Sequence, residues 1–187
     1  MIPQWTETDL YKKLYQAKPN YDKVINAHIS TVSGLIREFN INSVLDFGCG
    51  RHHVLIKQLS KKYPKVKFLG YDPAIEIKTQ ISTNEFDDSP VDMVVSTDCF
   101  EHVPENELNQ CFDLISSKNP KVLFFVISTR LASTLLPDGS NAHKTVKNGN
   151  WWQNKLQSGF LSFEIVQTNS FYEKHSVSEA HFFGLKK

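Results

Sequence analysis

The chain has 187 residues, 40% of them hydrophobic and 22% charged, which suits one domain with a sizeable core. Its 21 basic and 20 acidic side chains leave a formal charge of +1, which disfavours nucleic acid or an anionic membrane as a partner without excluding nucleic acid. No apolar run approaches the roughly 18 residues needed to span a bilayer, and the first residues lack the order of a signal peptide. Three cysteines without a C-x-x-C pair favour a reduced, cytoplasmic protein.

In chain order, the spacing of apolar residues predicts helices that alternate with short strands. Helical spacing, with one buried stripe per segment, occurs at residues 21–39, 54–63 and 104–115. Short apolar runs, the last apolar throughout, predict strands at residues 43–47, 65–71, 91–96 and 121–127. This alternation is typical of an α/β fold with a parallel sheet and right-handed crossovers.

The pattern changes after Ser128. A long polar loop is followed by a short predicted helix around Trp151 and Trp152, and then by two predicted strands at residues 160–167 and 179–185. No helix-length segment separates these two strands, so we expect them to pair antiparallel at one edge of the sheet.

The stretch "SVLDFGCGRHHVL" runs from a predicted strand through Gly48 and Gly50 into a predicted helix. Glycines in this place let the backbone approach a ligand closely, and the first amides of the helix can bind it. A single G-x-G is weak evidence, because tight turns also use glycine for geometry alone. Asp72 ends the next strand, 26 positions after Asp46, near the ~20-residue spacing at which an acid binds ribose hydroxyls. Together they predict a site for a nucleotide-containing cofactor.

"VLDFGCG", "FLGYDPA" and "VDMVVSTDCFEHV" resemble the class I S-adenosylmethionine-dependent methyltransferase superfamily over roughly residues 21–127. "YDPAI", "STDCFEHV" followed by "FFVISTR", and "LPDGSNAHKTVKNGNWW" are similar to small methyltransferase-domain proteins of phages and bacteria. The resemblance implies S-adenosylmethionine as cofactor and a three-layer, Rossmann-like α/β fold. Its seven-strand sheet would be mostly parallel, with an antiparallel C-terminal strand. We expect one methyltransferase domain over residues 1–187: an N-terminal helical region (1–40), a cofactor-binding core (41–127), and an acceptor loop, short helix and C-terminal strands (128–187).

The resemblance also implies the cofactor-binding residues. The glycine turn would surround the methionine part of the cofactor, Asp72 would bind its ribose, and residues 97–100 would form a wall of the cleft. Cys49 has no evident base beside it, so we expect it to fill space rather than to act as a nucleophile. The expected cofactor-binding residues are Asp46, Gly48, Cys49, Gly50, Asp72, Pro73, Thr97 and Asp98.

Two features depart from the family pattern. Where the family has the third small residue of G-x-G-x-G, this chain has His52. Its imidazole could narrow the cofactor site, turn outward or hydrogen-bond the cofactor, and we expect a tolerated change because Gly48 and Gly50 make the closest approach. Only 19 residues separate Asp72 from Asp92, which predicts a shortened connection with one strand short or missing. Asp87 and Asp88 are candidates for an adenine-binding acid, although solvated loop charges are the simpler interpretation.

Methyl transfer to a hydroxyl benefits from a base, because a neutral oxygen is a poor nucleophile. His143 lies in the loop after the strand at residues 121–127, where open α/β sheets bind ligands, with Asp138 and Asn141 close by in sequence. We predict His143 as the catalytic residue, with bracing of the loop as the alternative. No pair of histidines and acids has zinc-ligand spacing, so no metal is expected.

The predicted function is S-adenosylmethionine-dependent methylation, at oxygen rather than nitrogen, of a small or carbohydrate-like acceptor. No Asn/Asp-Pro-Pro-Tyr-type segment follows the strand at residues 91–96, which disfavours methylation of a base's exocyclic amine. One alternative is a non-catalytic S-adenosylmethionine-binding protein of the same fold, favoured by His52. Another is a nicotinamide-dependent oxidoreductase, disfavoured because His53 stands at the third glycine of G-x-G-x-x-G. No sequence feature indicates an oligomeric state.

Overall fold

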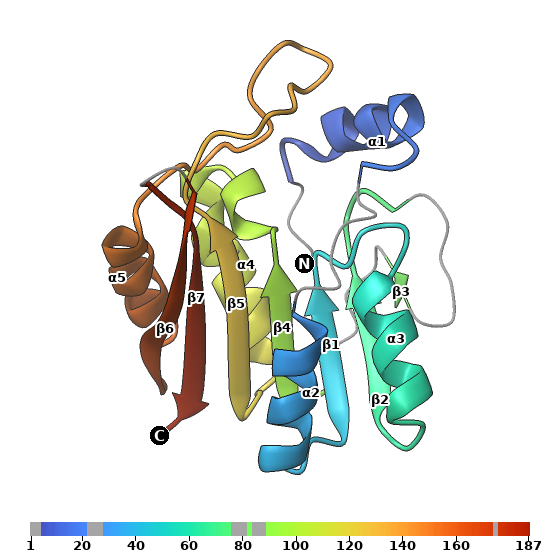
Figure 1. Cartoon of the computed structure of the whole chain (residues 1–187), viewed down its shortest axis with the longest axis vertical. Helices are drawn as coiled ribbons and strands as arrows, with labels where there is room; N and C mark the ends of the chain where they lie inside the picture. Colours follow the sequence, from blue (N-terminus) through green and yellow to red (C-terminus); the bar gives the residue numbers. More distant parts are fainter. Residues whose placement is uncertain (1–4, 22–27, 76–81, 84–88, 174–175) are drawn as a thin grey trace.

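The middle layer is a seven-stranded sheet (Figure 1), seen in a computed structural model that describes residues 5–21, 28–75, 82–83, 89–173 and 176–187. Its strands are β1 (Ser43–Phe47), β2 (Lys67–Tyr71), β3 (Ser82–Thr83), β4 (Met93–Thr97), β5 (Val122–Ser128), β6 (Phe163–Glu173) and β7 (Ser176–Lys186). They lie in the order β3-β2-β1-β4-β5-β7-β6. The first five strands are parallel to one another, while β7 pairs antiparallel with both β5 and β6. The predicted α/β sheet with its antiparallel C-terminal strand is therefore confirmed.

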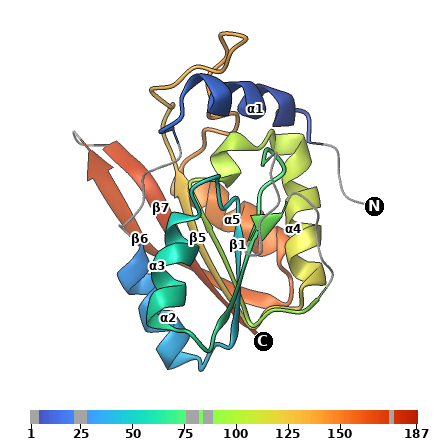
Figure 2. The same cartoon turned by 90° about the vertical axis from the view of Figure 1, so that its right-hand side faces the viewer.

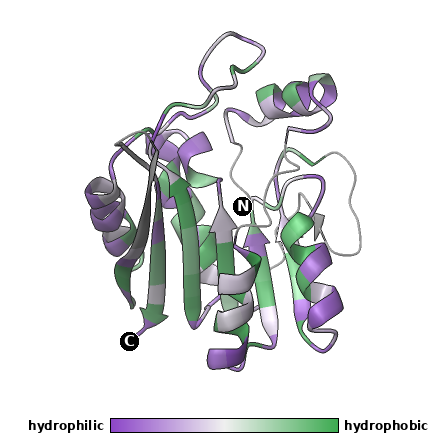
Figure 3. Cartoon of the chain, in the orientation of Figure 1, coloured by the Kyte–Doolittle hydropathy of each residue, from purple (hydrophilic) through white to green (hydrophobic). Residues whose placement is uncertain are grey.

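Helices cover both faces of this sheet, which gives the expected three layers (Figures 1 and 2). Helices α2 (Ile29–Glu38) and α3 (Val54–Lys62) cover one face, and α4 (Leu108–Ser117) and α5 (Gly149–Gly159) cover the other. Strand β5 is buried along its whole length because its side chains alternate between the two layers. Phe124 packs with the cluster under α2 and α3, and Phe125 with the cluster under α4 and α5. Figure 3 shows the apolar strands between helices whose outer sides are polar.

A further helix, α1 (Thr8–Ala17), lies across one end of the sheet, beside the loop that follows β5 (Figures 1 and 2). Tyr11, Leu14 and Tyr15 are its buried residues, and their spacing of three and four places them on one side of a helix. They pack against Leu136 and Ala142 of that loop. The helix predicted over residues 21–39 begins at Ile29 as α2, and residues 22–27 lie outside the described chain. None of the helices formed by the described residues has the length and apolar composition needed to cross a membrane.

The connection after β2 is short, as predicted. Strand β3 has two residues, which pair with Gly70 and Tyr71 at the end of β2. The expectation that one strand would be short or missing is therefore confirmed. The candidate adenine-binding acids, Asp87 and Asp88, lie outside the described residues.

The turn after β1 lies very close to the end of β4, and a comparison of two glycine substitutions can measure the energetic consequence of this contact. Gly48 and Gly139 have nearly the same positive φ, 85° and 86°, but a β-carbon on Gly48 would lie against Cys99, 2.7 Å from its β-carbon, while nothing lies within 4 Å at Gly139. We expect Gly139→Ala to cost about 1–2 kcal/mol of unfolding free energy through φ alone. Gly48→Ala should lose a further ~1–3 kcal/mol because the turn and Cys99 must separate. Urea unfolding of both variants checks this, and equal losses would contradict the close contact.

Candidate active site

The carboxyl ends of the parallel strands, the loop after β5 and α1 line a cavity of about 420 Å³. This volume lies within the roughly 300–1,000 Å³ of small-molecule sites. The structure brings to this one cavity all the residues that the sequence nominated for the cofactor, together with the predicted catalytic residue. They are Asp46, Gly48, Cys49, Gly50, Asp72, Pro73, Thr97, Asp98 and His143.

The glycine turn is held to β2 through its backbone. The amides of Gly48 and Cys49 both donate to the carbonyl of Tyr71, at 2.7 and 3.2 Å. Gly48 and Gly50 have positive φ, which glycine adopts without strain. His53 then begins α3 in the left-handed conformation, and its Nδ1 donates to the carbonyl of Gly50 at 2.9 Å. The turn is therefore fixed in shape before any ligand binds.

Asp72 joins the end of β2 to the glycine turn and to α1. Its Oδ2 accepts hydrogen bonds from the amide of Gly50 at 3.1 Å and from the hydroxyl of Tyr15 at 3.4 Å. Its Oδ1 accepts from the amide of Ala74 at 2.8 Å. The carboxylate lines the cavity. It is thus an oriented acceptor at the place where the sequence predicted a ribose.

Asp46 is buried at the end of β1, with 4% of its surface exposed. No hydrogen bond or ion pair to its side chain is found among the described residues. Burial, and secondly the negative charge of Asp72, raise the pKa of Asp46 to about 7. A cationic group of a ligand in the cavity would favour its ionised form.

The wall after β4 carries a second acid with a raised pKa, and its backbone is strained. Asp98 has a φ of 50°, and its pKa is raised to about 6, chiefly by burial and then by the charge of Glu179. Beside it, the thiols of Cys49 and Cys99 line the cavity, and burial raises the pKa of both well above the ordinary range. Neither thiol is suited to form the thiolate that a nucleophile requires.

His52 is turned away from the cavity. Its Nε2 donates to the carbonyl of Pro19 at 3.0 Å, in the segment that follows α1, and the ring is not part of the cavity lining. The neighbouring Arg51 lies 4.5 Å from the centre of the Tyr15 ring and donates to the carbonyls of Tyr15 and Lys18. Arg51 and His52 therefore contact α1 and the segment that follows it, and His52 no longer argues for a non-catalytic protein.

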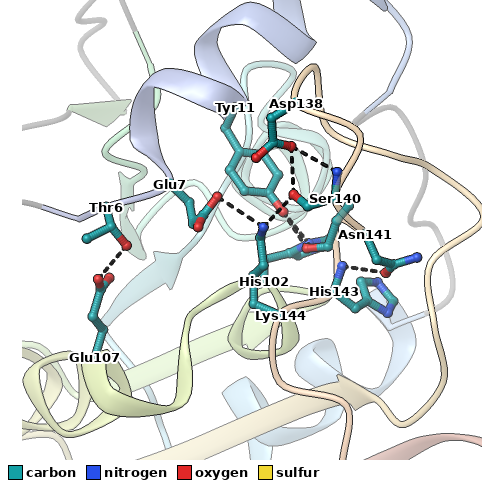
Figure 4. A network of polar contacts seen from close by, with 11 residues as sticks. Thr6, Glu7, Tyr11, His102, Glu107, Asp138, Ser140, Asn141, His143 and Lys144 are labelled. Atoms are coloured by element: carbon teal, nitrogen blue, oxygen red, sulfur yellow. Dashed lines mark hydrogen bonds and ion pairs between the residues drawn. The ribbon is translucent and has the colours of Figure 1, made fainter.

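His143 faces the cavity from the loop after β5, and a different group orients it than the sequence indicated. Its Nδ1 lies 2.6 Å from the carbonyl of Arg130. Asn141 accepts from the backbone amide of His143, whereas Asp138 accepts from the amide and hydroxyl of Ser140 (Figure 4). Burial lowers the pKa of His143, so the ring is neutral at neutral pH.

Several cavity residues were missed by the sequence reasoning. Trp5, Tyr11 and Tyr15 come from α1 and the segment before it, and His102 precedes α4 with the fully buried Glu101 beside it. The amphipathic spacing of "TDLYKKLYQA" was a usable signal for α1. No local spacing could show that Glu101 and His102 lie beside His143, because 40 residues separate the two histidines.

A family model described as a methyltransferase domain matches residues 14–177. The chain belongs to this methyltransferase-domain family. It is an S-adenosylmethionine-dependent methyltransferase, and the nicotinamide alternative has no support. No curated protein matches the sequence.

Solved methyltransferase structures share the fold. The methyltransferase domain of bacterial CtHen1 is 16% identical, with a TM-score of 0.59 over 84% of this chain and 97% of its own. DhpI, solved with SAH, is 15% identical, with a TM-score of 0.62 over 96% of both chains. The PH0226 protein of Pyrococcus horikoshii OT3 is 14% identical, with a TM-score of 0.61 over 94% of this chain and 99% of its own. Identities this low show a common fold and no more.

The cavity residues fit S-adenosylmethionine. The buried carboxylate of Asp46 suits a cationic group such as the cofactor's ammonium, and the oriented carboxylate of Asp72 suits hydroxyl donors. The volume and the open glycine turn leave room for a ligand of this class. The fit therefore agrees with the family.

Cofactor binding should release a proton from Asp46. With a pKa of about 7 in the free protein, Asp46 is largely protonated at pH 6, and a bound ammonium group favours its ionised form. The affinity for S-adenosylhomocysteine, which carries the same ammonium, should therefore rise from pH 6 to 8. Calorimetry at pH 6 in buffers of different ionisation enthalpy should count up to one released proton, and none in Asp46→Asn.

The matched control for this measurement is Asp113→Asn, on the exposed face of α4. It should release the same number of protons as the wild type. An Asp46→Asn variant that still releases the proton would show that another group is titrating.

Proposed function

We propose that the protein methylates a hydroxyl of a small or carbohydrate-like acceptor, with His143 acting on the acceptor oxygen. The observation that carries this proposal is the placement of an oriented imidazole in the same cavity as the cofactor residues. Residues 41–127 would bind the cofactor, and the segment from residue 128 would supply the acceptor side. The partner is then a small molecule.

Polar side chains on the acceptor side support a polar acceptor. This part of the cavity comes from the end of β5, the loop after it and β7, and each contributes hydrogen-bonding groups. They are Ser128, Arg130, Ser133, Thr134, Ser178 and Glu179. Hydroxyl and charged groups gathered in this way match an acceptor that carries several hydroxyls.

The tautomer of His143 supports a role at oxygen. The carbonyl of Arg130 can only accept, so Nδ1 carries the proton and Nε2 keeps its lone pair. When bound, S-adenosylmethionine supplies a methyl group activated by its sulfonium. A lone pair at Nε2 can prepare a hydroxyl for this methyl in two ways: by accepting its proton, or by holding a cation that polarises its oxygen.

A screen with labelled methyl donor tests the acceptor class. We expect label in hydroxyl acceptors, with sugars and other polyhydroxylated compounds ahead of amines, peptides and RNA. Label that enters only amines, or only RNA, would contradict the proposed acceptor while the cofactor assignment stands.

His143→Ala should separate acceptor chemistry from cofactor binding. We expect the single-turnover rate to fall by about 10²–10⁴, the usual contribution of a positioned acid–base group, with the S-adenosylhomocysteine dissociation constant nearly unchanged. Asp138→Ala is the matched control, since Asp138 lies in the same loop and bonds Ser140 rather than the imidazole. Its rate should stay within about twofold of the wild type. A His143→Ala variant with a lower melting temperature and normal turnover would instead assign His143 to bracing the loop.

A further inference from the structure

Three metal-ligating side chains from two distant segments meet at the acceptor side of the cavity. Ligand atoms of Glu101, His102 and His143 all lie within 4.8 Å of one another. The two imidazole rings have centroids 4.8 Å apart and are inclined at 75° (Figure 4). The segment after His143 is fixed against Glu101, because the amides of Lys144 and Thr145 donate to the Glu101 carbonyl at 2.7 and 3.0 Å.

Both imidazoles are held in the tautomer that a metal ligand needs. Nδ1 of His102 lies 3.0 Å from the carbonyl of Ala142 and 2.7 Å from the hydroxyl of Tyr11, whose proton goes to the same carbonyl. Nδ1 of His143 lies 2.6 Å from the carbonyl of Arg130. Since carbonyls only accept, both Nδ1 atoms carry protons and both Nε2 atoms keep lone pairs. A backbone carbonyl that fixes the other ring nitrogen is the usual support of a histidine ligand.

Glu101 is a buried acid, and one of its carboxylate oxygens has no hydrogen-bond partner among the described residues. It is fully buried, and its Oε1 accepts from the amide of Ser128 at 2.9 Å. Among the described residues, no hydrogen-bond partner reaches its buried Oε2. A buried carboxylate with an unpartnered oxygen requires a proton or a cation beside it.

We propose that Glu101, His102 and His143 bind a divalent transition-metal ion that polarises the acceptor hydroxyl. This inference rests on the proposed function and assigns the Nε2 lone pair of His143 to the cation. Two ligands at about 2.1 Å from one ion lie at most ~4.2 Å apart, so small side-chain movements complete the site. His102 and His143 also line the cavity, which leaves a coordination position open to the acceptor.

The donor set selects the kind of ion. Two imidazole nitrogens and one carboxylate suit Mn²⁺, Co²⁺ or Zn²⁺, whereas Mg²⁺ and Ca²⁺ prefer oxygen ligands alone. A hydroxyl bound to such an ion loses its proton to water more readily, since the ion stabilises the oxygen's negative charge. The oxygen then forms its bond to the methyl carbon as the carbon–sulfur bond breaks. The electron pair of that bond stays on sulfur, and the sulfonium becomes a neutral thioether.

A second group of possible ligands serves as the control. His28, Glu179 and His181 also lie close together, but His181 and Glu179 already bond to each other at 2.7 Å. Glu179 and His181 are thereby satisfied within the protein. His28→Gln therefore tests whether any bound ion sits at this group instead.

The test uses Co²⁺ as the probe, added to the full chain after treatment with a chelator. We expect one Co²⁺ per chain by calorimetry, with visible absorption bands that report nitrogen ligands, and much weaker binding of Mg²⁺. Glu101→Gln and His143→Gln should each weaken Co²⁺ binding at least tenfold. His28→Gln should bind as the wild type does, and thermal melting identifies any variant that fails to fold.

Absence of Co²⁺ binding by the wild type, unchanged binding in Glu101→Gln and His143→Gln, or loss only in His28→Gln would each overturn the site. Hydroxyl methylation that is undiminished by a chelator would overturn the role of the ion and leave the proposed function standing. Co²⁺ bound as expected, without methylation of any hydroxyl acceptor, would support the site and overturn the proposed acceptor.

Discussion

The carboxylate of Asp72 is shared by three parts of the chain that are distant in sequence. Asp72 directly follows β2, and its carboxylate accepts hydrogen bonds from the amide of Gly50 in the glycine turn and from the hydroxyl of Tyr15 in α1. Because each donor comes from a different element, the position of this one side chain sets how the turn faces the cavity and how α1 covers it. The same carboxylate is the acid that the sequence predicted to bind the ribose, so that prediction would make one group serve both the cover of the cavity and the cofactor.

Buried acids at both ends of the cavity explain what kind of ligands it can hold. Asp46 at the cofactor end and Glu101 at the acceptor end both have raised pKa values because burial removes them from water. In our proposals, a positive group that arrives with a ligand stabilises each end: the ammonium of the cofactor at Asp46 and a metal ion at Glu101.

The strands and the site residues next to them could be predicted because their signals are local. The all-apolar run that became β5, the glycine turn and the acid at the end of β2 each need only neighbouring residues. The environment of His143 could not be predicted in this way. Its orienting partner is a backbone carbonyl, which any residue type could supply, and Glu101 reaches it only through the fold. Asp138 was close in sequence, but the turn that it forms with Ser140 uses its hydrogen bonds.

The departure from G-x-G-x-G is explained by α1. A helix leaves its last carbonyls without partners inside the helix, and basic side chains satisfy them well. The last turn of α1 has no basic residue of its own, and Arg51 supplies the donors instead, to the carbonyls of Tyr15 and Lys18. His52 binds the next carbonyl in line, that of Pro19. A small residue at position 52 would leave that carbonyl without this donor. The imidazole therefore links the glycine turn to the segment that follows α1, the helix that lines the cavity.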